Sequence, residues 1–298
     1  MNRLTKKLML LLLVPLVSLI LVGCGSGQGS RAERSFVVGA IPDQNISKLN
    51  RRFQLFSDYL EKQTDLNVEY SRSNDYAALV TAFNRGEVHL GWFGGLTGVQ
   101  ARRAVPGSKA IAQRPRDKKF NSKFIVQADL DVQSLKDLKG LTFTFGDQNS
   151  TSGHLMPRYY LLRAGIEPSK DFAAPPNYSG SHDKTWKLVE SGAYQAGALN
   201  EAVWARAVRE NQVDTDKVRV FYTTPPYNDY NWTIHARVNE LFGTGTVSSI
   251  KQALLNLDPE NPREKKILDL FSAKGFVKTS NENYQAIEDV AKRVGIIQ

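Results

Sequence analysis

The chain has 298 residues and a formal net charge of +9, and its composition is ordinary for a soluble globular protein. This length exceeds the usual size of a single hydrophobic core, so two domains are expected. The basic balance suits an anionic ligand. The sequence has no basic run interleaved with aromatic residues and no known nucleic-acid motif, which argues against a nucleic-acid partner.

The first 23 residues predict an export signal that is not part of the fold. Arg3, Lys6 and Lys7 precede an apolar run over residues 8–22, and the run ends in LVGC, whose last residue is Cys24. These four letters resemble the lipobox of bacterial lipoproteins, which implies cleavage before Cys24 and lipidation of its thiol. The alternative is a chance cysteine after a plain signal peptide. Cleavage removes three basic side chains and leaves a net charge of +6.

Cys24 is the only cysteine in the chain, so no disulfide is expected in spite of the export signal. Residues 24–35 are rich in glycine and serine and would form a flexible lipidated tether. The acyl chains would then hold the protein at the outer or periplasmic face of the cell membrane.

Apolar runs alternate with segments of helical period between residues 36 and 113. We expect strands over 36–41, 67–70, 88–93 and 108–113, and helices over 49–63, 75–84 and 95–103. This alternation predicts an α/β layer with largely parallel strand pairing. Asn74 or Asp75 would cap the second of these helices.

A second α/β unit is expected between residues 121 and 229. The apolar segment 123–128 is expected to be the crossing into this unit. The predicted strands of the unit cover 141–145, 195–199 and 218–222. One predicted helix begins near 151, and two others cover 183–190 and 200–210. The chain would return into a strand over 232–236 and helices within 238–258, 264–272 and 282–294. Residues 36–120 and 230–298 would form one discontinuous lobe and 121–229 the other, with two hinge segments around a cleft.

The strongest site signal lies in the stretch LTFTFGDQNSTSGHLMPRYYLL, residues 141–162. It predicts a strand, a polar turn and a helix, with Ser150, Thr151, Ser152 and Gly153 at the junction. Unpaired N–H groups of the first helical turn, the helix dipole and three hydroxyls together suit an oxyanion. The alternative is that Ser150 or Thr151 is only a helix cap.

Three other strand-to-helix junctions carry groups that could converge on the same ligand. They contain Tyr76, the Gly94-Gly95 turn and His182. The competing interpretations are a half-buried core tyrosine, a simple strand end, and a surface or capping histidine. The four histidines show no metal-ligand spacing, and the sequence has no Walker loop, GxGxxG or GxSxG motif. We therefore expect neither an enzyme nor a bound cofactor or metal.

Seven short motifs, in this order, resemble the phosphate/phosphite/phosphonate-type substrate-binding proteins of ABC transporters. They are IPDQN (41–45), DYAA (75–78), WFGG (92–95), STSGH (150–154), GSHD (180–183), GALN (197–200) and TPPY (224–227). The likeness covers about residues 36–297 and is greatest to proteins labelled as selenate-binding. It implies a monomer with a type II periplasmic-binding fold that closes on a tetrahedral oxyanion. The implied partners are a membrane permease and its ATPase.

The resemblance also implies the site residues. The predicted ligand-binding set is Tyr76, Gly94, Ser150, Thr151, Ser152, His182, Asn200 and Tyr227. Gln195 and Asn200 stand where binders of aminoalkyl phosphonates use acidic residues, which favours a smaller inorganic anion.

The protonation of the ligand separates the candidate anions. Phosphate and phosphite-type ligands carry a proton or a P–H, and phosphate prefers a nearby carboxylate, whereas selenate and sulfate need only donors. Asp147, Asp183 or Asp229 in the site would therefore favour phosphate.

Two other functions share such a cleft: a sensor that partners a membrane kinase or chemoreceptor, and an exported phosphoryl- or acyl-transfer enzyme. The lack of a recognisable nucleophile–base pair disfavours the enzyme.

Overall fold

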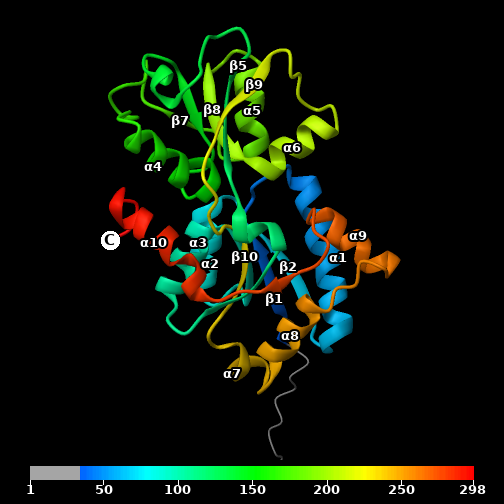
Figure 1. Cartoon of the computed structure of the whole chain (residues 1–298). Helices are drawn as coiled ribbons and strands as arrows, with labels where there is room; N and C mark the ends of the chain where they lie inside the picture. Colours follow the sequence, from blue (N-terminus) through cyan, green and yellow to red (C-terminus); the bar gives the residue numbers. More distant parts are fainter. Residues whose placement is uncertain (1–33) are drawn as a thin grey trace, which may run out of the picture. The chain divides into compact units, whose positions relative to one another are not determined.

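The computed structural model describes residues 34–298, so the export signal, Cys24 and nearly all of the tether lie outside the described residues. Two mixed β-sheets, each accompanied by helices, organise residues 34–298 (Figure 1). The expected α/β class with two lobes is confirmed. None of the helices in this part of the chain combines the length and apolar character that a membrane span requires.

The first sheet takes its strands from both ends of the described chain. In spatial order they are β11 (Val277–Lys278), β4 (Lys109–Gln113), β10 (Asn231–Ile234), β3 (Leu90–Phe93), β1 (Phe36–Ala40) and β2 (Val68–Arg72). β1 pairs in parallel with β2 and β3, whereas β10 pairs antiparallel with β3 and β4. The prediction of largely parallel strand pairing in this sheet is therefore wrong, because the returning strand β10 inserts between β3 and β4 in the opposite direction.

The helices of the first lobe fall into two groups (Figure 1). One group consists of α1 (Ile46–Thr64), α8 (Thr246–Leu255) and α9 (Pro262–Leu270), and the other of α2 (Tyr76–Asn84), α3 (Gly95–Ala104) and α10 (Gln285–Arg293). The remaining elements are α7 (Val238–Phe242) and the 3₁₀ turns η2 (Pro115–Lys119) and η5 (Asn281–Tyr284). The range 238–258 is mainly helical, as expected, and Gly243 and Gly245, with φ values of 106° and 94°, separate α7 from α8.

The start of α1 follows the capping rules. The Asn45 side chain accepts hydrogen bonds from the N–H groups of Ser47 and Lys48, at 3.0 and 3.3 Å. Phe53 and Phe56 on the inner face of this helix are fully buried. Each contributes about 1.5–3 kcal/mol of apolar burial, which fixes α1 and the residues before it against the sheet.

The second sheet is also mixed. Its spatial order is β7 (Asn177–Tyr178), β6 (Phe143–Phe145), β8 (Ala196–Asn200), β5 (Ser122–Gln127) and β9 (Val218–Thr223). Its helices and helical turns are η3 (Leu135–Leu138), η4 (Thr151–Leu155), α4 (Met156–Arg163), α5 (His182–Glu190) and α6 (Glu201–Arg209). Successive residues of a strand face opposite sides of a sheet, so Phe124 and Ile125 of β5 belong to separate apolar clusters on its two faces.

The chain crosses between the two sheets twice, and the two crossings lie side by side. Phe120 and Tyr227 exchange backbone hydrogen bonds of 2.8 and 2.9 Å as an isolated antiparallel bridge. Next to this bridge, Arg114 and Asp117 form a buried ion pair of 2.7 Å, and the Asp117 carbonyl accepts from the Asp229 N–H at 3.0 Å. Two short crossing strands of this kind are a common form of hinge.

Candidate functional site

The turn between β6 and α4 forms one wall of the candidate site. Ser150 Oγ accepts a hydrogen bond from the Gly153 N–H at 2.9 Å, so the capping interpretation is correct for this residue. A capping hydroxyl uses its oxygen as acceptor, and its O–H remains a donor. The hydroxyl residues of this turn are each at most 2 % exposed: Ser150, Thr151 and Ser152.

His182 packs directly against this turn. A Cβ added at Gly153 would lie 3.1 Å from His182 Cε1 and 2.9 Å from Ser150 Oγ, so only glycine fits at this position. The backbone N–H of His182 donates to the Asp43 carbonyl of the first lobe at 3.1 Å. The start of α5 therefore contacts both the turn of Ser150, Thr151 and Ser152, called the hydroxyl turn here, and the segment that follows β1.

The hydrogen bonding of His182 determines its tautomer. The backbone N–H of Asn200 donates to His182 Nδ1 at 3.3 Å. Because a backbone N–H can only donate, Nδ1 is unprotonated and the neutral ring carries its proton on Nε2. Burial lowers the pKa of His182 to about 4, so the ring is neutral at pH 7. Nε2 is buried without a hydrogen-bond partner among residues 34–298, which leaves it as a donor for a ligand.

Thr151 connects the hydroxyl turn to the first lobe. Its Oγ1 accepts from the Leu96 N–H at 2.9 Å, at the start of α3. A Cβ added at Gly94 would lie 3.1 Å from this hydroxyl and 3.4 Å from Asp229 Oδ1, and Asp229 Oδ1 itself accepts from the Gly95 N–H at 2.9 Å. The glycine turn and Asp229 of the returning crossing therefore meet at Thr151.

Two carboxylates border the same region. Asp229 Oδ2 and Asp43 Oδ1 are buried, and neither has a hydrogen-bond partner in the described part of the chain. Burial raises the pKa of Asp229 to about 7, so near neutral pH this carboxyl can hold or release a proton. The other oxygen of Asp43, Oδ2, accepts from the Tyr230 hydroxyl at 2.8 Å.

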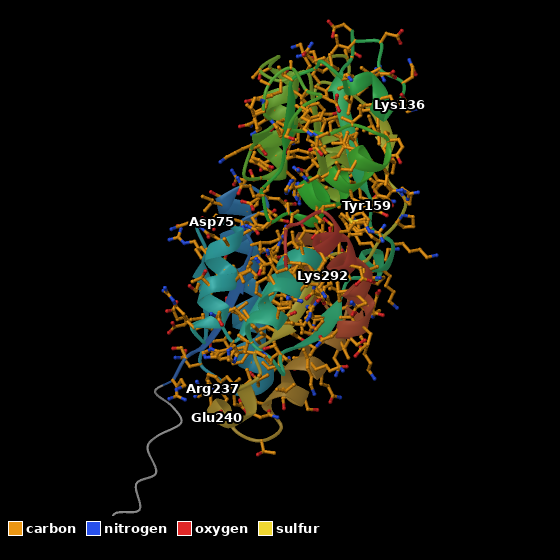
Figure 2. All side chains as sticks on the ribbon, turned by 90° about the vertical axis from the view of Figure 1, so that its left-hand side faces the viewer. Asp75, Lys136, Tyr159, Arg237, Glu240 and Lys292 are labelled. Carbon is orange, nitrogen blue, oxygen red and sulfur yellow. The ribbon has the colours of Figure 1, made fainter. Side chains whose placement is uncertain are left out.

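Tyr76 supplies a further buried hydroxyl. The preceding residue, Asp75, lies at the surface and caps α2 by accepting from the Ala78 N–H at 2.7 Å (Figure 2). Tyr76 is 1 % exposed, and its hydroxyl has no hydrogen-bond partner within residues 34–298. Burial, followed by the negative charge of Asp43, raises the pKa of this hydroxyl well above its usual value, so it stays protonated.

Two residues of the predicted set have other partners. The Tyr227 hydroxyl lies 2.7 Å from Ser122 Oγ, beside the hinge. The Asn200 side chain caps α6, since Oδ1 accepts from two backbone N–H groups, and its Nδ2 donates to the Tyr230 hydroxyl at 3.0 Å. Both side chains therefore stabilise the structure around the site through hydrogen bonds within the protein.

The three acidic residues considered from the sequence, Asp147, Asp183 and Asp229, differ in what their carboxylates contact. Asp147 Oδ1 accepts from the Asn149 N–H at 2.7 Å within its own loop, and Asp183 lines a cavity beside Trp186. Only Asp229, of the three acids considered from sequence, contacts the glycine turn that meets Thr151. Asp43 was missed, although it follows the carboxyl end of the parallel strand β1, where ligand sites of α/β sheets form.

This arrangement combines buried donors with buried acceptors, drawn from both lobes. Between residues 34 and 298, no group of three or more His, Cys, Asp or Glu side chains could hold a metal ion. A two-lobed α/β fold with hinge crossings and a buried polar site between the lobes defines a substrate-binding protein of the periplasmic type.

The chain belongs to the family described as ABC transporter, phosphonate, periplasmic substrate-binding protein, which matches residues 38–284. Members of this family are binding components of transporters and not enzymes, so the expectation of no catalysis is confirmed. Membership also places the protein outside the cytoplasm and implies a permease partner.

Individual relatives agree with this assignment. A curated protein of Prochlorococcus marinus (strain MIT 9301), named probable ABC transporter phosphite binding protein PhnD1, is 45 % identical over 267 residues, which cover 88 % of this chain and 90 % of that protein. A structure of PhnD1 from the same organism in complex with methylphosphonate has a TM-score of 0.86 and 44 % identity, and the match covers 90 % of this chain and all of that one. The phosphate-import protein PhnD of Mycolicibacterium smegmatis is 30 % identical over 188 residues, 59 % of each chain.

These names correct one expectation. The likeness to proteins labelled as selenate-binding is not supported, because three curated relatives carry phosphite, phosphate and phosphonates in their names. The motifs quoted from the sequence are specific to the family and contain no signal that separates phosphorus from selenium.

Proposed function

We propose that the mature chain is a lipid-anchored binding component of an ABC importer. It captures a protonated phosphorus oxyanion, such as phosphite or a short phosphonate, between its two lobes and delivers it to a membrane permease. The lobes are residues 36–120 with 230–298, and residues 121–229. Lipid on Cys24 anchors the protein, a role that the lipobox-like LVGC sequence at the end of the export signal supports.

The observation that carries this proposal is the mixture of unpartnered buried atoms. Tyr76 OH and His182 Nε2 are available as donors, while Asp43 Oδ1 and Asp229 Oδ2 are available as acceptors among the described residues. A buried polar group without a partner costs about 1–3 kcal/mol, so a ligand that satisfies both kinds of group gains affinity. The hydroxyls of Ser150, Thr151 and Ser152 complete the donor set.

The two acceptors select for a protonated ligand. A P–OH group can donate to a carboxylate, so an oxyanion of phosphorus satisfies Asp229 or Asp43 and also accepts from Tyr76 and His182. Sulfate and selenate are fully ionised at neutral pH and have no proton to donate. They would place negative charge against Asp43, and also against Asp229 whenever its carboxyl is ionised. The site therefore favours phosphorus over sulfur and selenium.

The expected affinity is moderate. Hydrogen bonds to a charged group contribute about 1.5–3 kcal/mol each. After the cost of association and lobe closure, several such bonds are consistent with roughly micromolar binding, about −8 kcal/mol. The ligands in the names of the relatives, phosphite and methylphosphonate, support the same chemical class.

A thermal-shift panel tests the proposal. The purified soluble part is melted with equal concentrations of phosphite, methylphosphonate, phosphate, sulfate and selenate, because a bound ligand raises stability by mass action. We expect the largest rise in melting temperature with phosphite or methylphosphonate and no rise with sulfate or selenate. A rise with sulfate or selenate that equals the best phosphorus ligand would contradict the proposal.

A further inference from the structure

Two cavities lie on the side of the candidate site that faces α6. The larger one, called the vestibule here, has a volume of about 350 Å³ and lies between the start of α1 and the helices α5 and α6. Its lining includes Gln44, Lys48, Trp186, Val203 and Arg206. The smaller one has a volume of about 10 Å³, which is about the space of one water molecule.

The small cavity adjoins both the vestibule and Asp43 of the candidate anion site. It shares Gln44, Val203 and Arg206 with the vestibule. It is also lined by Asp43 and Asn200, whose side chains both hydrogen-bond the Tyr230 hydroxyl at the anion site. A passage of one-water size therefore leads from Asp43 of the candidate site to a space that would hold a small organic group.

A bridge between the lobes closes this passage. The guanidinium of Arg206, on α6 of the second lobe, donates to Gln44 Oε1 of the first lobe. The Gln44 amide in turn donates to Asp43 Oδ2 at 3.3 Å. The bridge thus runs from the vestibule to a carboxylate of the candidate site.

We propose that the Gln44–Arg206 bridge sets the size of ligand that the protein accepts. This inference rests on the proposed function. Phosphite and methylphosphonate fit on the inner side of the bridge, whereas a longer substituent on phosphorus meets Arg206 and Gln44 before it can reach the vestibule. The bridge therefore restricts the site to oxyanions with no substituent or one about the size of a methyl group.

The charge of the passage adds a second restriction. Arg52 and Arg206 line the small cavity, and Arg52 Nε is buried without a partner within residues 34–298. Arg114 lines it too, but its guanidinium is held by Asp117 at 2.7 Å. Asp43 is the carboxylate that faces these cations in the cavity lining. A substituent that carries an ammonium group is therefore repelled, and an uncharged alkyl substituent is the appropriate probe of size.

Calorimetric titration of Arg206→Ala with methylphosphonate and propylphosphonate tests the inference. We expect the unmodified protein to bind methylphosphonate and to reject propylphosphonate. Removal of the Arg206 side chain opens the passage, and each methylene that becomes buried is worth about fourfold in affinity, from about 0.8 kcal/mol. Relative to methylphosphonate, propylphosphonate should therefore gain at least about tenfold in the variant.

Lys48→Ala is the matched control. Lys48 also lines the vestibule and also links the lobes, through a 3.3 Å ion pair with Glu210, but it takes no part in the bridge. It should leave the preference for methylphosphonate unchanged. The inference is overturned if Arg206→Ala keeps the size preference of the unmodified protein, if it loses methylphosphonate binding, or if the unmodified protein binds both ligands equally. Failure of the unmodified protein to bind phosphite and methylphosphonate would instead overturn the proposed function, and with it this inference.

Discussion

The Thr151 hydroxyl of the second lobe accepts a hydrogen bond from the Leu96 N–H of the first lobe at 2.9 Å. Leu96 lies in the first turn of α3, whose N–H groups have no partner within the helix. One side chain of the hydroxyl turn thus satisfies a helix end in the other lobe. This contact ties the position of the lobes to the geometry of the candidate site.

Substitution of Thr151 tests this link. Thr151→Ala removes the hydroxyl and leaves the Leu96 N–H without its partner, so we expect phosphite or methylphosphonate to bind at least about tenfold more weakly. Thr151→Ser keeps the hydroxyl and should stay within about threefold of the unmodified protein. Calorimetric titration of both variants makes the comparison, and equal affinities in the two would show that the hydroxyl has no role.

His182 and Ser152 are predicted to contact the anion directly. His182→Ala removes the Nε2–H donor and Ser152→Ala removes a buried hydroxyl, so each should weaken anion binding by at least about tenfold. Ser248→Ala, at an exposed position of α8, serves as the control and should leave the affinity unchanged. Unchanged affinity in both site variants would refute the assignment of these residues.

Asp229 is predicted to discriminate between anions. Asp229→Asn removes the negative charge but keeps the size of the side chain. The variant should bind methylphosphonate at least about tenfold more weakly, because a charge-assisted hydrogen bond is lost. It should also lose part of the rejection of sulfate, since the repulsion is gone. A competition titration with sulfate measures both effects, and a variant that rejects sulfate as strongly as the unmodified protein would argue against Asp229.

Acid is expected to destabilise the protein through its buried histidines. Burial lowers the pKa values of His89, His154 and His182 to about 4, whereas an unfolded histidine titrates near 6.5. The stability from each neutral ring is complete above pH 6.5 and is lost as the pH falls from 6.5 to 4. Asp229, whose pKa burial raises to about 7, acts in the opposite direction over the same range. Burial also raises the pKa values of Asp117, Asp147 and Glu201, which act in the same direction as Asp229. We expect the three large histidine shifts to outweigh these acids.

Thermal melts in the absence of ligand should therefore show lower stability at pH 5 than at pH 7, by about 2 kcal/mol per histidine before the opposing contribution of the buried acids. His89 Nδ1 accepts from the Val37 N–H at 2.8 Å, far from any residue of the site. His89→Asn can keep this hydrogen bond without a group that titrates, so its melting temperature should depend less on pH. An equal pH dependence in the variant would exclude His89 as a cause.

The membrane anchor is tested at Cys24. Cys24→Ser removes the thiol that would carry the lipid, so the protein should move from the membrane fraction to the soluble fraction of the producing cells. Mass spectrometry of the unmodified protein should show an acylated chain that begins at Cys24. A membrane-bound Cys24→Ser protein or an unlipidated mature chain would contradict the anchor.

Local features of the fold were predictable because local sequence determines them. The order of strands and helices follows from hydrophobic periodicity, and the capping of α2 by Asp75 follows from a short polar residue before a helical segment. The direction of β10 was not predictable, since its neighbours β3 and β4 lie more than a hundred residues earlier in the chain. Only the tertiary structure decides such pairings.

The strand-to-helix junctions that form the candidate site were predictable to the same extent. Ser150, Thr151, Ser152 and His182 follow strand ends or begin helices, so their junctions are visible in the sequence. The sequence does not show which polar atoms form hydrogen bonds within the protein and which remain available to a ligand. Tyr227 pairs with Ser122, and the Asn200 amide supports Tyr230, whereas Asp43 and Asp229 each retain a free oxygen among the described residues. These differences arise from tertiary contacts between residues that are far apart in the sequence.

The selection of a protonated phosphorus oxyanion is tested most directly by calorimetric titration of the unmodified protein at pH 7 with methylphosphonate, phosphite and sulfate in parallel. We expect binding of methylphosphonate or phosphite with a dissociation constant of roughly 1 μM or below and no measurable binding of sulfate. Sulfate that binds as tightly as both phosphorus ligands would contradict the role assigned to Asp43 and Asp229.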